Sequence, residues 1–237
     1  MRILAFESSA KAASVALIQD GVLLAESFQN NGKTHSATLM PMAKQVLEDC
    51  GITASELDAV AVVKGPGSFT CVRIGVAAAK GLAWGAEKPV CGVSTLEAMA
   101  TQMVMLEGVI CPVMDARRSQ VYNALFQSDG KTLERLTPDR AISLEELKKD
   151  LESCEKSIFL VGDGANLCYN TLLEAVPHLV LPPAHLLMQR ASGVALAAEK
   201  LAEQGLLQSP GELEPNYLRL SQAERERLEK LKQSKGD

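Results

Sequence analysis

Segment 65–70, Gly-Pro-Gly-Ser-Phe-Thr, is the part of this 237-residue chain whose residue types point most directly to ligand binding. It lies between an apolar run that predicts a strand and a pattern that predicts a helix. Free N–H groups and the positive end of the helix dipole meet at such a turn, and both attract anions. The segment lacks the closing Gly-Lys-Ser/Thr of a Walker loop and the spacing of a dinucleotide fingerprint. Alone, it therefore favours a sharp strand-to-helix turn, with Ser68 available as the helix cap.

Two predicted strands, one in each half of the chain, end with an acidic residue at equivalent positions. Glu7 is followed by Ser8 and Ser9 at the end of the first strand, and Asp115 ends a strand in the second half of the chain. Carboxylates at the ends of equivalent strands could flank a cleft that holds a nucleotide with its metal ion. The alternative is two acids that hydrogen-bond within their own turns. Sequence spacing leaves both interpretations open.

The chain has no residue pattern typical of a metal pair or an activated nucleophile. Two histidines four apart on a helix can face one metal ion, but the residue four positions after His35 is Leu39. His178 and His185 are separated by two prolines, which interrupt a helix, so all three histidines are interpreted as surface or cap residues. The six cysteines form no CxxC pair, and no serine has the flanking glycines of a nucleophile elbow. We therefore expect no metal site, no catalytic residue, and six buried or half-buried thiols.

Strands and helices that would position these residues are predicted twice in the same order. Each block predicts three antiparallel strands, a helix, a strand, a glycine-containing loop and a helix. The first block has strands at 2–8, 14–19, 22–28 and 57–64, with helices at 35–51 and 71–85. The second block has strands at 109–114, 120–127, 132–136 and 158–161, with helices that begin at 143 and after 164. Capping boxes are expected at 94–97 and 143–146, and a further helix at 191–203. The doubled order predicts two α/β lobes.

The composition excludes several functional classes. The 24 basic and 29 acidic residues give a formal net charge of −5, and the 1 Trp, 3 Tyr and 5 Phe are few aromatic residues for this length. A protein that binds nucleic acid by itself usually has a basic stripe with stacking aromatic side chains. No apolar run is long enough for a membrane span, and an acid at position 7 comes too early for a secretory signal. We therefore expect a cytoplasmic protein that is not a stand-alone RNA-binding protein.

The helix predicted at 71–85 contains many small residues, among them Gly75 and Gly81. A glycine inside a helix costs about 1 kcal/mol relative to alanine, so two of them indicate close packing against a neighbour. The neighbour could be internal, or it could be another chain that contacts the apolar face of Met40, Met42, Ala43 and Val46 beside this helix. Packing in the core is the default interpretation, and a subunit interface is the main alternative.

Several blocks of residues together resemble the bacterial TsaB (YeaZ) family. These blocks are 64–70, 72–75, 79–82, 92–98, 115–118 with 121–122, and 215–219. The match extends from the first strand to the last of these blocks. The resemblance implies an α/β, actin-like fold (ASKHA, related to sugar kinases and Hsp70) with two lobes, each a mixed sheet flanked by helices. That fold agrees with the doubled order of the elements.

The resemblance also implies a function in making N6-threonylcarbamoyladenosine (t6A) at adenosine 37 of tRNAs that read ANN codons. In that pathway TsaC makes threonylcarbamoyl-adenylate, TsaD carries the metal and transfers the group, and TsaE is an ATPase that joins the assembly. A TsaB-like chain would be a non-catalytic subunit that pairs with TsaD and TsaE and has a functional link to TsaC. It would contact tRNA mainly through TsaD, and it could form a homodimer when isolated. The resemblance implies no cofactor, with weak binding of ATP or ADP and Mg²⁺ left open, mainly at the partner junction.

Two sets of site residues follow from the family match. In the family, the helices after His35 and Thr70 form the interface with TsaD or with a second TsaB. The predicted interface therefore consists of Ser36, Leu39, Met40, Ala43, Phe69, Arg73, Val76, Ala79 and Lys80. A vestigial nucleotide cleft is predicted at Glu7, Ser8, Ser9, Asp115, Gly162, Asp163 and Gly164.

The chain departs from the family pattern at two positions near that cleft. Glu7 stands where the first strand's acid is usually Asp, and Cys71 stands where the loop usually continues with glycine. The longer acid argues against ordinary phosphate geometry, and a side chain at position 71 narrows the approach of a ligand.

Two other functions are weighed against the partner subunit. One is a nucleotide-binding ATPase or kinase-like enzyme of the actin-like fold, and the other is an inactive glycopeptidase-like protein. The predicted domains are an N-terminal lobe at 1–99, joined by a helical segment at about 190–220, a second lobe at 100–189, and a charged tail at 221–237.

Overall fold

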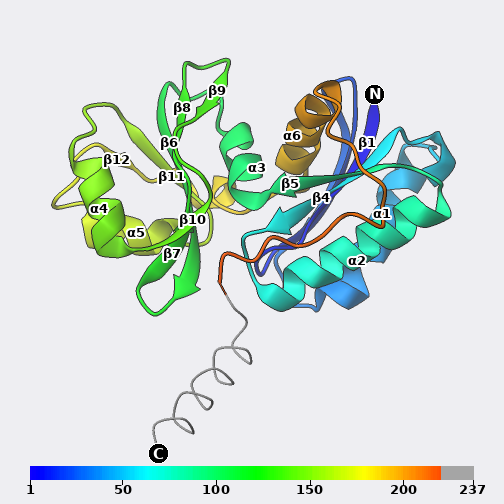
Figure 1. Cartoon of the computed structure of the whole chain (residues 1–237), viewed down its shortest axis with the longest axis horizontal. Coiled ribbons are helices and arrows are strands. Elements are labelled where there is room, and N and C mark those ends of the chain that lie inside the picture. The colour runs from blue at the N-terminus through cyan, green and yellow to red at the C-terminus, as the bar shows by residue number, and fades with distance from the viewer. Residues whose placement is uncertain (220–237) are drawn as a thin grey trace, which may run out of the picture.

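The computed structural model describes residues 1–219, which are arranged around two β-sheets that lie side by side (Figure 1). The five-stranded sheet has the order β3-β2-β1-β4-β5. The seven-stranded sheet has the order β10-β7-β6-β11-β12, and β8 and β9 are attached beside β6. We call each sheet with the helices packed on it a lobe, the first lobe holding the N-terminus. The charged tail predicted at 221–237 lies outside the described residues.

The sheet of the first lobe is buried on both faces along β1, β2 and β4, whereas its edge strand β3 is partly exposed. It consists of β1 (Arg2–Glu7), β2 (Ala13–Gln19), β3 (Val22–Gln29), β4 (Ala59–Gly65) and β5 (Val90–Ser94). The first three strands are antiparallel, and β4 and β5 continue the sheet in parallel with β1. Because side chains alternate along a strand, Leu4 and Phe6 belong to one hydrophobic cluster while Ile3 and Ala5 belong to another.

Four helices cover these two faces of the first sheet. α1 (His35–Asp49) and α2 (Phe69–Gly85) pack on the face of Leu4 and Phe6. α6 (Ala191–Glu203) packs on the opposite face and contacts α3 (Thr95–Gln102). The short side chains of Ala191, Ala195 and Ala198 let α6 approach the sheet closely. Residues near position 195 therefore complete the core of a lobe that begins at position 2.

The second lobe is built around the long strand β6 (Gly108–Arg117). Its other elements are β7 (Gln120–Asn123), β8 (Phe126–Ser128), β9 (Leu133–Arg135), β10 (Arg140–Ser143), α4 (Leu144–Glu152), β11 (Ile158–Val161), α5 (Ala165–Leu172) and β12 (Leu179–Val180). Helices α4 and α5 cover one face of the sheet. The other face packs against α3, which lies between the two sheets in Figure 1 and contacts both α6 and β6. Short 3-10 turns occur at Ala54–Glu56 and Ala184–Leu186.

The strand predicted at 120–127 is divided into β7 and β8, and that prediction is wrong. Pro112 lies opposite this break in β6, and proline has no N–H for the strand ladder. The buried amide of Asn123 donates hydrogen bonds to the carbonyl of Pro112 at 3.0 Å and to that of Ala124 at 3.1 Å. This side chain satisfies backbone groups that the interrupted ladder leaves free. Strands β10 and β12 were not predicted.

The two predicted capping boxes have different outcomes. At the start of α4, Ser143 and Glu146 satisfy each other's backbone N–H groups, so that box is confirmed. At the start of α3, the hydroxyl of Ser94 accepts from the N–H of Glu97, but the Glu97 carboxylate forms an ion pair with Arg135 at 2.9 Å. The box predicted at 94–97 is therefore only half formed. The predicted domain boundaries at 99 and 189 stay a prediction.

No helix within residues 1–219 combines the length and the apolar character needed to cross a bilayer. All six cysteines are free thiols, and each of them is buried or half-buried.

We predict opposite effects for two glycine-to-alanine changes in α2. A Cβ at Gly75 would lie 2.1 Å from the Oγ of Ser8, whereas a Cβ at Gly81 would meet nothing within 4 Å. Gly75→Ala should lower the free energy of unfolding by about 1–3 kcal/mol through overpacking. Gly81→Ala, the matched control, should raise it by up to about 1 kcal/mol through helix propensity. Urea unfolding measures both changes, and equal values for the two variants would contradict the packing of α2 on β1.

Candidate binding cleft

A cavity of about 840 Å³ lies between the two lobes. Six segments meet around it: the β1–β2 turn, the N-terminal ends of α1 and α2, the β6–β7 turn, the Asp163 loop, and residues 216–219. Its size lies within the range of sites for small ligands. Of the seven residues predicted for a vestigial nucleotide cleft, Ser9, Asp115 and Asp163 line this cavity.

The Glu7 side chain is enclosed by its own turn. One carboxylate oxygen, Oε1, accepts hydrogen bonds from both the N–H and the hydroxyl of Ser9, each at 2.6 Å. The other oxygen, Oε2, is buried without a partner among the described residues. Burial is the main cause that raises the pKa of Glu7 to about 7, and the nearby Asp163 carboxylate adds to the rise. Glu7 is therefore fully buried and does not line the cavity.

The turn after β1 is also fixed onto the start of α2. The hydroxyl of Ser8 donates to the carbonyl of Cys71 at 2.9 Å, and the N–H of Ser68 donates to the carbonyl of Ser9 at 2.7 Å. A Cβ at Gly67 would lie 2.6 Å from that same carbonyl oxygen. Segment 65–70 thus binds the neighbouring turn of its own chain. Ser68 occupies the N-cap position, but its side chain makes no capping hydrogen bond.

Asp115 hydrogen-bonds within the β6–β7 turn, as the simpler sequence interpretation expected. Its carboxylate accepts from the N–H of Arg117 at 2.7 Å and pairs with the Arg117 guanidinium at 3.3 Å. Arg117, Arg118 and Ser119 have φ values of 65°, 56° and 56°, a left-handed conformation that is unfavourable for residues with a side chain. This strained turn holds Arg117 at the cavity, where its side chain is exposed.

The Asp163 loop closes the cavity from the second lobe. Asp163 keeps contact with solvent through the cavity, and Gln189 donates to its carboxylate at 3.2 Å. The surrounding protein still desolvates Asp163 enough to raise its pKa, and Asp115 raises it further. Gly162 and Gly164 do not line the cavity, because both lie against the backbone of β6 near Val113.

The C-terminal strap, residues 209–219, crosses the first lobe and reaches the second. The backbone N–H of Asn216 donates to the carbonyl of Lys64 at 2.6 Å, and the ring of Tyr217 stacks on Phe69 with centroids 4.6 Å apart. Arg219 donates to the carbonyl of Ala116 at 2.5 Å, so the strap connects α2 with the β6–β7 turn. The Nζ of Lys80 donates hydrogen bonds to the carbonyls of Gly211 and Leu213 and so holds the earlier part of the strap.

The structure divides the predicted interface residues into two groups. Leu39, Ala43, Val76 and Ala79 belong to the buried core between α1, α2 and the first sheet. A partner cannot touch these four side chains while the helices stay packed. Ser36, Met40 and Arg73 are exposed, and Phe69 and Lys80 are half-buried. The interface stays a prediction, now restricted to these five residues.

Sequence reasoning missed several residues of the cavity. Lys11 and Lys33 come from polar loops without a motif, and Tyr122 was noticed only within the block 121–122. His35 is buried rather than on the surface, with its Nε2 2.9 Å from the carbonyl oxygen of Ala10. Tyr217 and Arg219 were noticed only within the block 215–219. Their place in the cavity depends on the path of the strap, which no local pattern indicates.

The acids of this cavity do not fit a nucleotide that is carried with Mg²⁺. Glu7 is enclosed in its own turn, where burial raises its pKa to about 7, and Asp115 is engaged by Arg117. Within residues 1–219, no group of three or more His, Cys, Asp or Glu side chains could hold a metal ion. The cavity instead carries the exposed side chains of Lys11, Lys33 and Arg117, and its wall includes the rings of Tyr122 and Tyr217.

Comparisons with known proteins give a consistent set of relatives. The family model described as "TsaD: tRNA N6-adenosine threonylcarbamoyltransferase" matches residues 23–227. The chain is 35% identical to the Bacillus subtilis tRNA threonylcarbamoyladenosine biosynthesis protein TsaB, over 98% of this chain and 100% of that protein. It is 33% identical to the Escherichia coli protein of the same name, over 92% of this chain and 95% of that protein.

Solved structures confirm the predicted actin-like, two-lobe α/β fold. A Pseudomonas aeruginosa protein described as similar to the peptidase YeaZ has a TM-score of 0.80 at 27% identity, covering 92% of this chain and 99% of that one. At 13% identity, component A of (R)-2-hydroxyglutaryl-CoA dehydratase from Acidaminococcus fermentans has a TM-score of 0.51 over 86% of this chain and 99% of that one. This second likeness extends to the fold alone.

We predict that Glu7→Gln flattens the dependence of stability on pH. The pKa of Glu7 rises from an ordinary value of 4.5 to about 7 on folding, so between these values the folded state holds a proton that the unfolded state releases. The free energy of unfolding should therefore be highest below pH 4.5 and decrease by roughly 3 kcal/mol as the pH rises through 7. A neutral glutamine removes this decrease.

Urea unfolding of the wild type and Glu7→Gln across this pH range measures the effect. Glu145→Gln, an exposed change on α4, is the matched control and should keep the wild-type slope. An unchanged slope in Glu7→Gln would show that Glu7 is ionised in the folded protein.

Proposed function

Since this chain belongs to the TsaB family of tRNA threonylcarbamoyladenosine biosynthesis proteins, we propose that it is the non-catalytic subunit that pairs with a TsaD protein. The pair would transfer the threonylcarbamoyl group to adenosine 37 of tRNAs that read ANN codons, with TsaD supplying the catalytic residues.

The enclosure of Glu7 is the observation that carries this proposal. A cleft that positions a nucleotide for transfer needs a charged group aimed at the ligand, ready before the reaction begins. The acid at the end of β1 is instead fully buried and takes both of its hydrogen bonds from Ser9. Such a carboxyl group stabilises its own turn, which suits a structural subunit better than an enzyme.

The exposed face of α1 and α2 supports pairing with another protein. Met40 is 41% exposed on α1, and Arg73 is exposed on α2, where its guanidinium lies 4.9 Å from the Phe69 ring centroid. Methionine and arginine are enriched at protein interfaces relative to other surfaces. Both helices are held rigidly from below by the shared core, so the face is ordered before a partner binds.

The proposal extends to the other members of the pathway. TsaE would join the pair, TsaC would supply its adenylate, and the complex would function in the cytoplasm. The isolated chain could pair with itself through the same face of α1 and α2. Weak binding of ATP or ADP with Mg²⁺ belongs at the junction with the partner, since the acids of the inter-lobe cavity are already engaged.

The proposed function is tested by reconstitution. Purified chain, TsaD, TsaE, tRNA and TsaC product should together form threonylcarbamoyladenosine, and omission of TsaD should abolish the product. The same chain alone should give no transfer at any concentration. Transfer by the chain without TsaD would refute the non-catalytic role, and normal transfer without the chain would refute its function as a required subunit.

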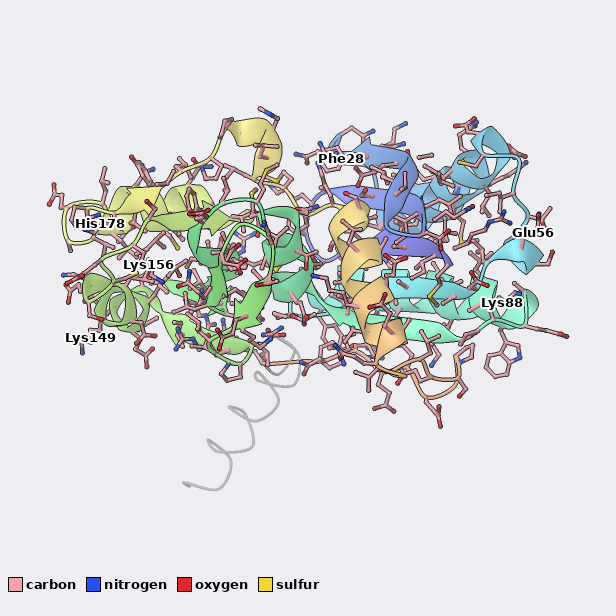
Figure 2. All side chains as sticks on the ribbon, turned by 90° about the horizontal axis from the view of Figure 1, so that it is seen from above. Phe28, Glu56, Lys88, Lys149, Lys156 and His178 are labelled. Atoms are coloured by element: carbon pink, nitrogen blue, oxygen red, sulfur yellow. The ribbon has the colours of Figure 1, made fainter. Side chains whose placement is uncertain are left out.

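We predict that Met40→Glu and Arg73→Glu weaken pairing with TsaD at least about tenfold, because each change places an unpaired negative charge in the interface. Both side chains are on the surface, so the variants should fold normally. Sedimentation velocity measures the pairing. Lys149→Glu, which lies on α4 of the second lobe (Figure 2), is the matched charge-reversal control. If the two folded variants pair as tightly as the control, the interface lies elsewhere.

A further inference from the structure

The charge of the inter-lobe cavity is opposite to the charge of the whole chain. Four basic side chains line it, Lys11, Lys33, Arg117 and Arg219, against the acids Asp115 and Asp163. The chain as a whole carries a formal charge of −5. Lys11 and Lys33 are exposed and form no ion pair with another described residue, so their charge is free for a ligand. The cavity therefore attracts anions locally, despite the overall repulsion.

Aromatic side chains gather at the same place. Phe69, Tyr122 and Tyr217 line the cavity, although the chain has only 5 Phe, 3 Tyr and 1 Trp. Tyr217 is 42% exposed, and its stack on Phe69 holds the ring in a fixed orientation. An exposed ring that is held in place offers a surface on which a nucleobase can stack.

From this combination we infer that the cavity binds a segment of single-stranded RNA, with lysines and Arg117 on the phosphates and Tyr217 beneath a base. The inference rests on the proposed function, which brings the chain to tRNA. Basic side chains that follow a backbone, together with exposed rings, are the usual means by which proteins bind unpaired nucleotides.

Two further features favour RNA over a free nucleotide with Mg²⁺. The basic residues come from four separate segments around the opening, an arrangement that suits a series of phosphodiesters better than one triphosphate chain. The turn that would cradle a triphosphate is already occupied, because the carbonyl of Ser9 accepts from Ser68 and a Cβ at Gly67 would collide with it. The base of the cleft is thus filled by the turn at Ser9 and the segment at Gly67 and Ser68, whereas its opening remains accessible.

Single-stranded RNA also explains the purpose of the strained β6–β7 turn. Three consecutive left-handed residues cost conformational energy, and such strain persists where a function requires a particular side-chain position. The turn is held by Asp115 from one side and by Arg219 of the strap from the other. Arg117 is thereby presented to the cavity from the second lobe, opposite the lysines of the first.

The test is fluorescence anisotropy with a fluorescein-labelled tRNA anticodon stem-loop RNA, using the full chain alone and in complex with TsaD. Lys11→Glu/Lys33→Glu should weaken binding at least about tenfold and reduce the slope of log K against log salt by about 1.4, the value for two phosphate contacts on a single strand. Tyr217→Ala should weaken binding about fivefold or more, and Tyr217→Phe, which keeps the ring, should bind like the wild type.

Lys88→Glu/Lys149→Glu is the matched control, because these two lysines lie at opposite ends of the molecule (Figure 2). It should leave RNA binding unchanged. The inference is overturned if the Lys11→Glu/Lys33→Glu variant keeps the wild-type affinity and salt slope, or if the wild type binds no RNA in either form. It is also overturned if ATP with Mg²⁺ displaces the RNA and binds through the same two lysines.

Sedimentation of the same variants with TsaD separates this inference from the proposed function. Lys11→Glu/Lys33→Glu should pair with TsaD normally while it loses RNA. If the wild type does not pair with TsaD, the proposed function is refuted. If the variants pair normally and also bind RNA like the wild type, only the RNA site is refuted.

Discussion

The attachment of the β1–β2 turn to the start of α2 is the constraint on which the rest of the molecule depends. Ser8 and Ser9 bind the backbone of Cys71 and Ser68, and this contact requires glycine at positions 67 and 75. It sets the distance between α2 and the first sheet, and hence the shared core of α1 and α2. It also buries Glu7, whose carboxyl group is then shielded from the inter-lobe cavity. The packing of α2 and the enclosure of Glu7 thus depend on the same turn.

The turns of the chain itself fill the base of the inter-lobe cleft, and two surfaces around it remain exposed. The outer face of α1 and α2 is rigid because everything beneath it is packed, and this rigidity reduces the entropy that a partner must remove on binding. The opening of the cleft retains exposed basic side chains and rings. The overall charge of −5 is therefore an average over the chain, and the basic opening of the cleft differs from it in sign.

Local patterns predicted most of the fold, and they failed where distant residues decide the outcome. The strands β1 to β4 and the helices α1, α2 and α6 follow directly from apolar periodicity and turn residues. The break between β7 and β8 depends on Pro112, which lies in another strand, and the half-formed box at Ser94 depends on Arg135. In the cavity, Ser9, Asp115 and Asp163 were predictable from strand ends. Lys11, Lys33 and Tyr217 were not, because tertiary folding alone brings them together.

The position of α6 has a consequence for the order in which the protein can form during synthesis. One face of the first sheet stays uncovered until Ala191–Glu203 has emerged from the ribosome, since α6 supplies the alanines that pack there. The second lobe, whose strands and helices lie between Gly108 and Val180, is translated entirely within that interval. The lobe translated first is therefore the lobe completed last. One apolar face of the first sheet is therefore uncovered while the whole second lobe is translated, and an exposed apolar face of this kind is prone to aggregation.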